Sequence, residues 1–366
     1  MIDILITGIG SRRGGVGSVI LNLLKELDRQ MFSPTILLTY DSELEPDIKS
    51  LNVSILKVTP FGKSIKKYRN DLNRIFASHK FDYVWINNTS KVDVIIFQIA
   101  KKYAVRTIAH SHGTACEGSL LKKSIFKIWE FFTSRSFYKN LDIAIACSQK
   151  SAEYFYSKNY RDKNKVHVLL NSIDVDMFKF DSAARTNVRE ELCLKEEKAI
   201  FAVGRITQVK NPFFMIKLID SLPKLYKLVL VGDGDLLEEI MSFISERQLE
   251  DRVMILGSRK DVARLLNGAD IFILPSFNEG YPVAVVEAQA NGLTCIISDT
   301  ITQEVLLFDD CVSARLNDIN GWKHAILNVK DKKREGFAHK VEELGFDNKA
   351  YAVKFEQIIL SDFYGI

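Results

Sequence analysis

The stretch FNEGYPVAVVEAQANG, residues 277–292, combines a helix start with two carboxylates in otherwise apolar surroundings. Pro282 suits the first turn of a helix, because its missing N–H would have no partner there, and Gly280 permits a tight turn before it. Glu279 is therefore expected just before the helix, and Glu287 within its second turn. The helix follows a short apolar run, so the two carboxylates are predicted at a strand-to-helix junction.

Such junctions recur along the whole chain, because short runs rich in Val, Ile and Leu alternate with helix-length amphipathic stretches. This alternation is typical of a parallel sheet covered by helices. In the first half the predicted strands are 2–7, 33–39, 53–58, 82–87, 105–110, 142–147 and 165–170. In the second half they are 199–204, 227–232, 252–257, 270–275 and 293–298. The pattern predicts an α/β fold built from two Rossmann-like domains.

The length of the chain also favours two domains, because 366 residues exceed what one hydrophobic core usually supports. The charged segment 176–198 has no strong apolar periodicity and is predicted to be a linker without a core element. We predict one domain over 1–180, a second over 181–345, and a C-terminal helix at 346–366 that packs back on the first. Ligands of open parallel sheets bind at the carboxyl ends of the strands, so the sheets are expected to face a central cleft.

The composition excludes several classes of protein. A hydrophobic fraction of 47% and a charged fraction of 26% are those of an ordinary globular protein. A net charge of +4 without a recognised module argues against a nucleic-acid binder. The five scattered cysteines lack C-x-x-C spacing, which indicates a reducing cytoplasm rather than disulfides or zinc. Neither a signal peptide nor a membrane span is predicted, so any membrane contact would be peripheral.

A glycine-rich loop follows the first predicted strand, in the sequence GIGSRRGGVGSVILNLLKEL from residue 8. Glycines let backbone N–H groups approach an anion closely, and the start of the following helix attracts negative charge. A phosphate or another anion is therefore expected near Gly14, Gly15 and Gly17. The strict Rossmann and Walker spacings are absent, so a loop that merely turns tightly is the alternative.

Two cations follow the first strand of the second half, in GRITQVKN at 204–211. Arg205 can donate to two oxygens at once, whereas Lys210 acts as a mobile point charge, and together they suit a diphosphate. Asn211 and Pro212 are predicted to open the next helix. The alternative is a pair of solvated surface cations.

The two carboxylates of the opening stretch suit hydroxyl groups. Glu287 is predicted to accept hydrogen bonds from two ribose hydroxyls, and Glu279 from hydroxyls of a sugar. The backbone N–H groups near the helix start, at Gly280, Tyr281 and Val283, remain available for phosphate or sugar oxygens. Two ordinary surface glutamates are the alternative, but the apolar surroundings of Glu287 do not resemble a solvated face.

At this point the chain resembles a known family, the retaining nucleotide-sugar glycosyltransferases of family 4, which have the GT-B fold. The resemblance spans nearly the whole chain, and its most specific parts are the Arg/Lys pair and the E-x7-E stretch. AHSHGT is similar to members that build bacterial capsular polysaccharides or exopolysaccharides. The family commonly has glycine where this chain has Ser172. The matching motifs are GGVG at 14–17, HSHG at 110–113, IACS at 145–148, NSIDVDMF at 171–178, VGRITQVKN at 203–211, LVGDGDL at 230–236 and EGYPVAVVE at 279–287.

The resemblance implies a role for each matching residue. The first domain would bind the acceptor and the second the nucleotide sugar. His112 or His110 would lie at the reaction centre, without a metal or other cofactor, although D-x-D triplets occur at 174–176 and 233–235. The residues that it assigns to catalysis are His112, Glu279, Arg205 and Lys210. Those that it assigns to the donor are Gly15, Arg205, Lys210, Glu279, Gly280, Tyr281, Pro282, Val283 and Glu287.

The reaction implied by the resemblance is transfer, with retention, of a hexose or N-acetylhexosamine. The expected donor is a UDP-sugar and the expected acceptor a lipid-linked glycan of a bacterial surface polysaccharide. One alternative is a sugar-nucleotide epimerase of the same fold, which would need no acceptor. Another is a nucleotide-sugar-binding subunit without turnover.

The segment 119–140 mixes basic and aromatic residues. Such a helix suits an anionic bilayer surface, where a lipid-linked acceptor would be found. The expected location is the cytoplasm, with peripheral contact to the inner face of the cell membrane. The alternative is a helix that packs its aromatic side chains into the first domain.

Overall fold

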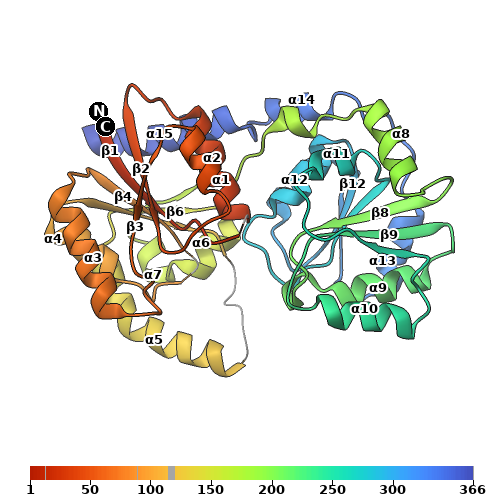
Figure 1. The fold of residues 1–366 in the computed structure, drawn as a ribbon, viewed down its shortest axis with the longest axis horizontal. Coiled ribbons are helices and arrows are strands. Elements are labelled where there is room, and N and C mark those ends of the chain that lie inside the picture. Colours follow the sequence, from red (N-terminus) through yellow and green to blue (C-terminus); the bar gives the residue numbers. More distant parts are fainter. Residues whose placement is uncertain (13, 89, 114–119, 366) are drawn as a thin grey trace. The chain divides into compact units, whose positions relative to one another are not determined.

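The computed structural model describes residues 1–12, 14–88, 90–113 and 120–365. The chain divides into two compact units, and each surrounds a parallel sheet of its own (Figure 1). Unit 1 comprises Met1–Ser172 together with Asn348–Ile366, and unit 2 comprises Ile173–Asp347. The predicted α/β class, with two sheets of parallel strands, is confirmed.

The sheet of unit 1 has seven strands in the order β3-β2-β1-β4-β5-β6-β7. Its strands are β1 (Ile2–Thr7), β2 (Phe32–Leu38), β3 (Ser54–Lys57), β4 (Tyr83–Asn88), β5 (Arg106–Ser111), β6 (Ile143–Ala146) and β7 (Val166–Val168). The strand order reverses between β1 and β4, which is the position where open α/β sheets bind their ligands. Thr7 pairs with Ile86, and Asn87 pairs with His110, so the carboxyl ends of β1, β4 and β5 are neighbours.

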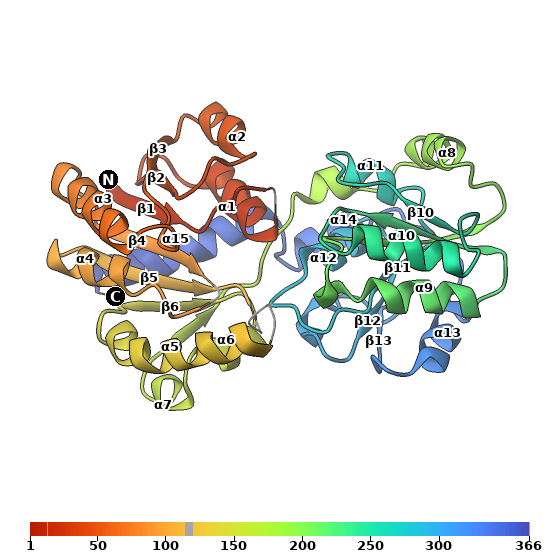
Figure 2. The same ribbon diagram turned by 60° about the horizontal axis from the view of Figure 1, so that its bottom comes forward.

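The helices of unit 1 cover both faces of this sheet (Figure 2). They are α1 (Gly15–Glu26), α2 (Glu45–Ser50), α3 (Ile65–Ser78), α4 (Ile95–Lys102), α5 (Leu120–Lys139), α6 (Gln149–Phe155), α7 (Lys158–Arg161) and α15 (Asn348–Tyr364). Buried side chains of α3, α4 and α6 share one core cluster with the strands, whereas α1 contacts α15. No helix within the described residues is both long and apolar enough to cross a membrane.

The sheet of unit 2 has six strands in the order β10-β9-β8-β11-β12-β13. Its strands are β8 (Lys198–Val203), β9 (Tyr226–Val231), β10 (Val253–Ile255), β11 (Ile271–Leu274), β12 (Thr294–Ser298) and β13 (Val312–Ala314). Here the order reverses between β8 and β11. The ends of these two strands precede the predicted Arg/Lys pair and the E-x7-E stretch, so both motifs lie at the same edge of the sheet.

The helices of unit 2 also lie on both faces of its sheet (Figure 1). They are α8 (Ser182–Glu191), α9 (Pro212–Ser221), α10 (Leu237–Glu246), α11 (Val262–Leu266), α12 (Val283–Ala290), α13 (Ile319–Leu327) and α14 (Phe337–Glu343). Short 3-10 helices are η1 (Val175–Phe178), η2 (Gln208–Lys210) and η3 (Gln303–Val305). Buried side chains of α9, α10 and α13 form one core cluster with the strands, on the opposite side of the sheet from α11 and α12.

The prediction that 176–198 is a linker without a core element was wrong. The segment contains α8, whose Val188 is fully buried. Arg185 and Arg189 attach the helix to Asp270, with nitrogen–oxygen distances of 2.6 and 3.1 Å. The helix therefore needs no apolar stripe, because ion pairs and hydrogen bonds hold it on the sheet. The strand β13 was also missed, because three residues are too few to show a period.

Candidate functional site

The Arg/Lys pair of unit 2 lies directly after β8. Gly204 follows the strand with φ +146°, and Arg205 comes next, whereas Lys210 ends η2. A Cβ atom on Gly204 would lie 3.0 Å from Cε of Lys210, so the lysine side chain lies across this glycine. The two cations are thus brought together by a turn that starts at a glycine.

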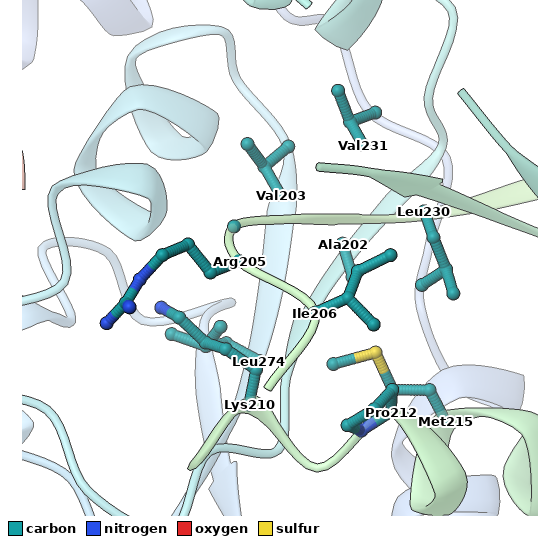
Figure 3. Close-up of a pocket in the computed structure, with 11 residues that line it drawn as sticks. Ala202, Val203, Arg205, Ile206, Lys210, Pro212, Met215, Leu230, Val231 and Leu274 are labelled. Atoms are coloured by element: carbon teal, nitrogen blue, oxygen red, sulfur yellow. The ribbon is translucent and has the colours of Figure 1, made fainter. Parts of the chain in front are cut away.

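A small pocket lies behind these two cations (Figure 3). Its volume is about 20 Å³, which is room for about one water molecule. The side chains of Arg205 and Lys210 extend to the same side in Figure 3, away from Met215. Apart from Gly204 and the two cations, its lining is Ala202, Val203, Ile206, Pro212, Met215, Leu230, Val231 and Leu274. The pocket is therefore lined mainly by apolar side chains, and any diphosphate held by the two cations would lie at its opening.

Lys210 also contacts the predicted sugar-binding carboxylate. Its Nζ atom lies 2.7 Å from Oε1 of Glu279, and the two side chains are 22% and 15% exposed. Glu279 lies in the loop between β11 and α12, so the pair joins two strand-to-helix junctions. Each side chain therefore gives the other an oppositely charged partner at the sheet edge.

The helix α12 begins one residue later than predicted, because Pro282 is its N-cap and Val283 its first residue. Gly280, Tyr281 and Pro282 are buried, and the ring of Tyr281 stacks on Phe346 with 6.3 Å between centroids. The loop before the helix is therefore anchored by an aromatic contact within unit 2. Val283 is half-buried.

Glu287 lies in the second turn of α12, as predicted. Its neighbours Val286 and Ala288 are fully buried. Burial raises the pKa of Glu287 to about 7. Near neutral pH the carboxyl group therefore changes between a neutral form and an ionised form, and only the ionised form accepts hydrogen bonds through both oxygens.

In unit 1, Gly14 is the N-cap of α1 and Gly15 its first residue. A Cβ atom at Gly14 or Gly15 would meet nothing within 4 Å, whereas one at Gly17 would lie 2.5 Å from a methyl carbon of Leu44. Packing therefore explains Gly17 but not Gly14 or Gly15. The open space at the last two is compatible with the close approach of a ligand to the backbone.

The two histidines of unit 1 lie at the end of β5. His110 is fully buried between Trp85 and His112, with ring centroids 5.8 and 4.1 Å away. Neither ring nitrogen of His110 has a hydrogen-bond partner among the described residues. Burial lowers the pKa of His112 to about 3 and lowers that of His110 well below its usual range. Both rings are therefore neutral at physiological pH.

Asn87, which the sequence analysis did not single out, fixes the proton of His112. Its Nδ2 donates to the carbonyl oxygen of Thr7 at 2.9 Å, so its Oδ1 faces Nε2 of His112 at 2.7 Å. An amide oxygen only accepts, and Nε2 of His112 must therefore carry the proton. Nδ1 is left as an acceptor, buried and without a partner among the residues that the structure describes.

Gly8 makes room for this amide. It has φ +105°, and a Cβ atom there would lie 2.4 Å from the backbone oxygen of Asn87. A side chain at this position is thus excluded by backbone atoms of the neighbouring strand. A polar residue at the end of β4, beside the strand that carries HSHG, was the signal that could have identified Asn87.

The predicted site residues thus fall into two sets. Arg205, Lys210 and Glu279 lie together in unit 2, with Glu287 further along α12. Gly15 and the histidines belong to unit 1. The roles assigned to all of them stay predictions, whereas the pairing of Lys210 with Glu279 is an observed contact.

Two family models match the chain. The model described as "Glycosyltransferase Family 4" matches residues 13–177, and that described as "Glycosyl transferases group 1" matches residues 184–315. The first therefore lies within unit 1 apart from its last residues, and the second lies within unit 2.

Named relatives agree with these matches. EpsF of Bacillus subtilis (strain 168), which is named as a glycosyltransferase, is 28% identical over 353 residues, covering 92% of this chain and 91% of the relative. An Escherichia coli enzyme is 28% identical over 275 residues, covering 72% of this chain and 70% of its own length. Its name is UDP-Gal:alpha-D-GlcNAc-diphosphoundecaprenol alpha-1,3-galactosyltransferase.

Solved structures share the fold over the whole chain. The structure of Anabaena Alr3699/HepE in complex with UDP and glucose has a TM-score of 0.81 at 16% sequence identity, covering 99% of this chain and 100% of the other. Sucrose-phosphate synthase from Thermosynechococcus elongatus has a TM-score of 0.82 at 15% identity, covering 100% of both chains. At these identities the likeness concerns the fold alone.

Proposed function

This chain belongs to the family 4 glycosyltransferases and has the GT-B fold, and from that premise we propose the reaction that it catalyses. It transfers a hexose or N-acetylhexosamine from a UDP-sugar to a lipid-linked glycan, with retention at the anomeric carbon. The observation that carries the proposal is the pairing of Lys210 with Glu279 at 2.7 Å, beside Arg205 at the end of β8. An epimerase and a subunit without turnover are not favoured, because the named relatives are transferases.

The cations act on the leaving group. As the bond to the sugar breaks, negative charge grows on the diphosphate, and Arg205 and Lys210 stabilise it from fixed positions. One well-placed donor of this kind is typically worth roughly 3 to 4 kcal/mol of the barrier. When the diphosphate binds, Lys210 shares its charge between a phosphate oxygen and Glu279, which is then held in place to accept hydroxyls of the sugar.

The chemical step exchanges one C–O bond for another. The acceptor hydroxyl oxygen forms a bond to the anomeric carbon on the face from which UDP departs. The bond between that carbon and the β-phosphate oxygen breaks, and the proton of the acceptor hydroxyl passes to a phosphate oxygen of the departing UDP. The proposal assigns charge stabilisation to the two cations and includes no metal ion or other cofactor.

Glu287 binds the ribose of the donor through its ionised carboxylate. Two vicinal hydroxyls can donate to its two oxygens, and such charge-assisted hydrogen bonds are stronger than neutral ones. Because the pKa of Glu287 is about 7 in the free protein, donor binding is coupled to loss of its proton. The backbone N–H groups of Gly280, Tyr281 and Val283, and that of Gly15, are assigned to phosphate or sugar oxygens.

His112 accepts a hydrogen bond from a substrate hydroxyl through Nδ1. Asn87 is its positioning residue, because the 2.7 Å hydrogen bond to Nε2 fixes both the tautomer and the ring plane. His110 lies behind it without any polar partner among the described residues and is assigned no contact with substrate.

The lipid-linked acceptor is inferred from relatives. One is named for a diphosphoundecaprenol-linked acceptor in Escherichia coli, and another, from Campylobacter jejuni, is named for a diphospho-undecaprenol-linked one. We assign this chain to the cytoplasmic side of surface polysaccharide synthesis on the same grounds.

The helix α5 supports contact with an anionic membrane. Phe137 is fully buried in the core of unit 1, whereas four large apolar side chains earlier in the helix are exposed. These are Ile128, Trp129, Phe131 and Phe132, with exposed fractions of 61, 42, 79 and 74%. Basic residues at Lys127 and Arg135 flank them. Within the predicted segment 119–140, residue 119 lies outside the described residues.

The reaction is tested by incubating the protein with UDP- and GDP-sugars and a diphosphoundecaprenol-linked N-acetylglucosamine acceptor. We expect UDP release that depends on the acceptor, a product heavier by one sugar, and an anomeric configuration by NMR equal to that of the donor. An inverted product would contradict retention, and an altered nucleotide sugar without acceptor would favour the epimerase. Sedimentation with anionic vesicles tests α5 separately, and no binding at low salt would reject the membrane contact.

A further inference from the structure

A second hollow lies in unit 1, at the carboxyl ends of β3 and β4. Its volume is about 500 Å³, within the roughly 300–1,000 Å³ of ligand pockets. Its lining comes from the loop and helix start after β3, from residues 90–93 after β4, and from one side chain of α5. Its lining includes two aromatic rings, a cation and a carboxylate, which are Phe61, Trp129, Lys63 and Asp93.

Two aromatic rings form one wall of this hollow. The centroids of Phe61 and Trp129 are 5.9 Å apart, with planes inclined by 47°. Phe61 is also held edge-on by Tyr68, at 5.8 Å. The Trp129 side chain is 42% exposed, so part of its ring face is open. Apolar ring faces of this kind suit the C–H face of a pyranose, and aromatic walls with a few polar groups are typical of small-ligand sites.

A carboxylate and a cation complete the lining. Oδ2 of Asp93 accepts from the hydroxyl of Tyr68 at 2.5 Å, and its Oδ1 accepts from the backbone N–H of Ile95 at 3.1 Å. These contacts fix the group, yet a carboxylate has about four acceptor positions, so it can also accept a hydroxyl. Lys63 is exposed and suits a phosphate next to the sugar.

We infer that this hollow binds the saccharide head of the acceptor, with its ring against Phe61 and Trp129 and a hydroxyl on Asp93. The inference rests on the proposed function, and names a site for the second substrate. The two cations assigned to the donor diphosphate, Arg205 and Lys210, belong to unit 2, whereas the hollow is built entirely from unit 1. Its residues Ser90, Val92 and Asp93 follow β4, the strand that carries Asn87, at the sheet edge where His112 follows β5.

The position of Trp129 ties the hollow to the lipid of the acceptor. This side chain lines the hollow and also belongs to the exposed apolar group of α5. A sugar head in the hollow would therefore leave its carrier chain beside Ile128 and Phe132. The diphosphate between the two would lie near Lys63.

Tryptophan fluorescence gives a direct readout. Trp85 and Trp322 are fully buried, so quenching by acrylamide reports chiefly on Trp129. The probe is a water-soluble head, methyl diphospho-N-acetylglucosamine. We expect it to lower the quenching constant about twofold, because a pocket ligand covers most of the surface that it contacts. Trp129→Phe should lose the signal, and no protection of the wild-type protein by the head would overturn the inference.

An experiment with vesicles distinguishes binding of a sugar head in the hollow from contact of Trp129 with a membrane surface. Anionic vesicles of phosphatidylglycerol without acceptor form the second arm. Protection of Trp129 by these vesicles, with none by the soluble head, would mean that Trp129 contacts lipid only, and would overturn the inference. Protection by the head in the absence of vesicles supports it.

Kinetics give the second test. Phe61→Ala and Asp93→Asn should each raise the KM for the lipid-linked acceptor by about tenfold, the usual effect of losing about 1.4 kcal/mol of binding. The affinity for UDP, measured by calorimetry, should not change. Tyr154→Ala, which removes a 44%-exposed ring elsewhere in unit 1, is the matched control. Unchanged acceptor KM in both variants would overturn the inference, whereas a wild-type protein that does not bind UDP would refute the donor site instead.

Discussion

The polar groups at the strand ends of the two units differ in charge. In unit 2 the groups are charged, and Lys210 and Glu279 compensate each other across 2.7 Å. In unit 1 the groups are neutral, because His112 has a pKa of about 3 and is oriented by the amide of Asn87. The sheets themselves are alike, since both reverse their strand order beside the first strand.

This difference shows that the sheet determines where a polar group lies, whereas the residues that follow each strand determine whether that group is charged or neutral. A glycine with positive φ directly follows the first strand in both units, at Gly8 and at Gly204. At Gly8 the space is taken by the backbone of Asn87, whereas at Gly204 it is taken by the flexible end of Lys210. A side chain at Gly8 would therefore collide with backbone, whereas one at Gly204 would displace only the end of a lysine side chain.

At the charged strand ends of unit 2, loss of one side chain should have the largest effect on the rate of the reaction. Lys210→Ala should lower kcat by about 10²- to 10³-fold, because a fixed donor to the departing diphosphate is lost. Steady-state kinetics with the preferred UDP-sugar measure it. Lys217→Ala, on the exposed side of α9, should leave kcat unchanged. A loss below threefold at Lys210 would refute the role of this cation, and with it the contrast between a charged and a neutral strand end.

The two glycines should differ in their effect on folding. Gly8→Ala places a Cβ atom against backbone and should cost about 3 kcal/mol of stability, from strain and overlap together. Gly204→Ala should cost about 1 kcal/mol, from strain alone, because the Lys210 side chain can move. Urea unfolding followed by tryptophan fluorescence measures each unit when the other unit carries no tryptophan: Trp322→Phe leaves the signal of unit 1, and Trp85→Phe together with Trp129→Phe leaves that of unit 2. Equal losses in both variants would contradict the difference in rigidity.

At the neutral strand ends of unit 1, a new charge beside His112 should change how the activity depends on pH. Asn87→Asp places a carboxylate at Nε2 of His112, which raises the pKa of the imidazole and converts Nδ1 from acceptor to donor. We expect kcat/KM to fall about tenfold near pH 6 and to recover as pH rises and the ring loses its proton. With the donor at saturating concentration, so that the titration of Glu287 does not limit binding, the wild-type profile of kcat/KM for the acceptor should show no such limb between pH 5 and 8. Asn164→Asp, exposed in the same unit, is the control.

Glu287 should make donor binding depend on pH. Its pKa of about 7 means that the ionised fraction rises from about one tenth to about nine tenths between pH 6 and 8. UDP affinity should therefore rise by up to about tenfold over this range, in proportion to the binding-competent fraction. Calorimetry at both pH values checks this, and Glu287→Gln should remove the dependence. The same slope in the variant would show that another group titrates.

The same group should affect stability in the opposite sense. Because burial raises its pKa from 4.5 to about 7, the folded protein binds the proton more tightly than the unfolded chain. Stability is therefore lost as pH rises from about 4.5 to 7. Glu287→Gln cannot ionise and should melt at a higher temperature than the wild type at pH 8, by the smallest margin of the effects considered. A lower melting temperature would contradict the pKa.

Much of this arrangement follows from local sequence. The Val-, Ile- and Leu-rich runs gave every predicted strand to within a few residues, because buried parallel strands leave a continuous apolar signal. The contact of Lys210 with Glu279 follows from two motifs at neighbouring strand ends. In contrast, α8 was missed because its attachment through Arg185, Arg189 and Asp270 joins residues far apart in sequence.

Other features needed the fold itself. Asn87 matters only because β4 lies between β1 and β5, which brings Thr7 and His112 to its two sides. The raised pKa of Glu287 needs the packing around α12. The hollow beside Trp129 draws on three separate segments, and no single stretch of sequence predicts it.

The helix α15 makes unit 1 depend on residues translated after all of unit 2. Its Phe355 packs on Trp85 with 4.6 Å between centroids, and its Asp362 accepts from the hydroxyl of Tyr83 at 2.7 Å. During synthesis unit 2, which is the continuous segment 173–347, can fold before the chain is complete. The sheet of unit 1 is made earlier, but Trp85 and Tyr83 stay exposed until α15 has been synthesised. We therefore expect unit 2 to complete its folding before unit 1, which reverses the usual order in which amino-terminal domains fold first. Chaperones would then bind the incomplete unit 1 rather than unit 2.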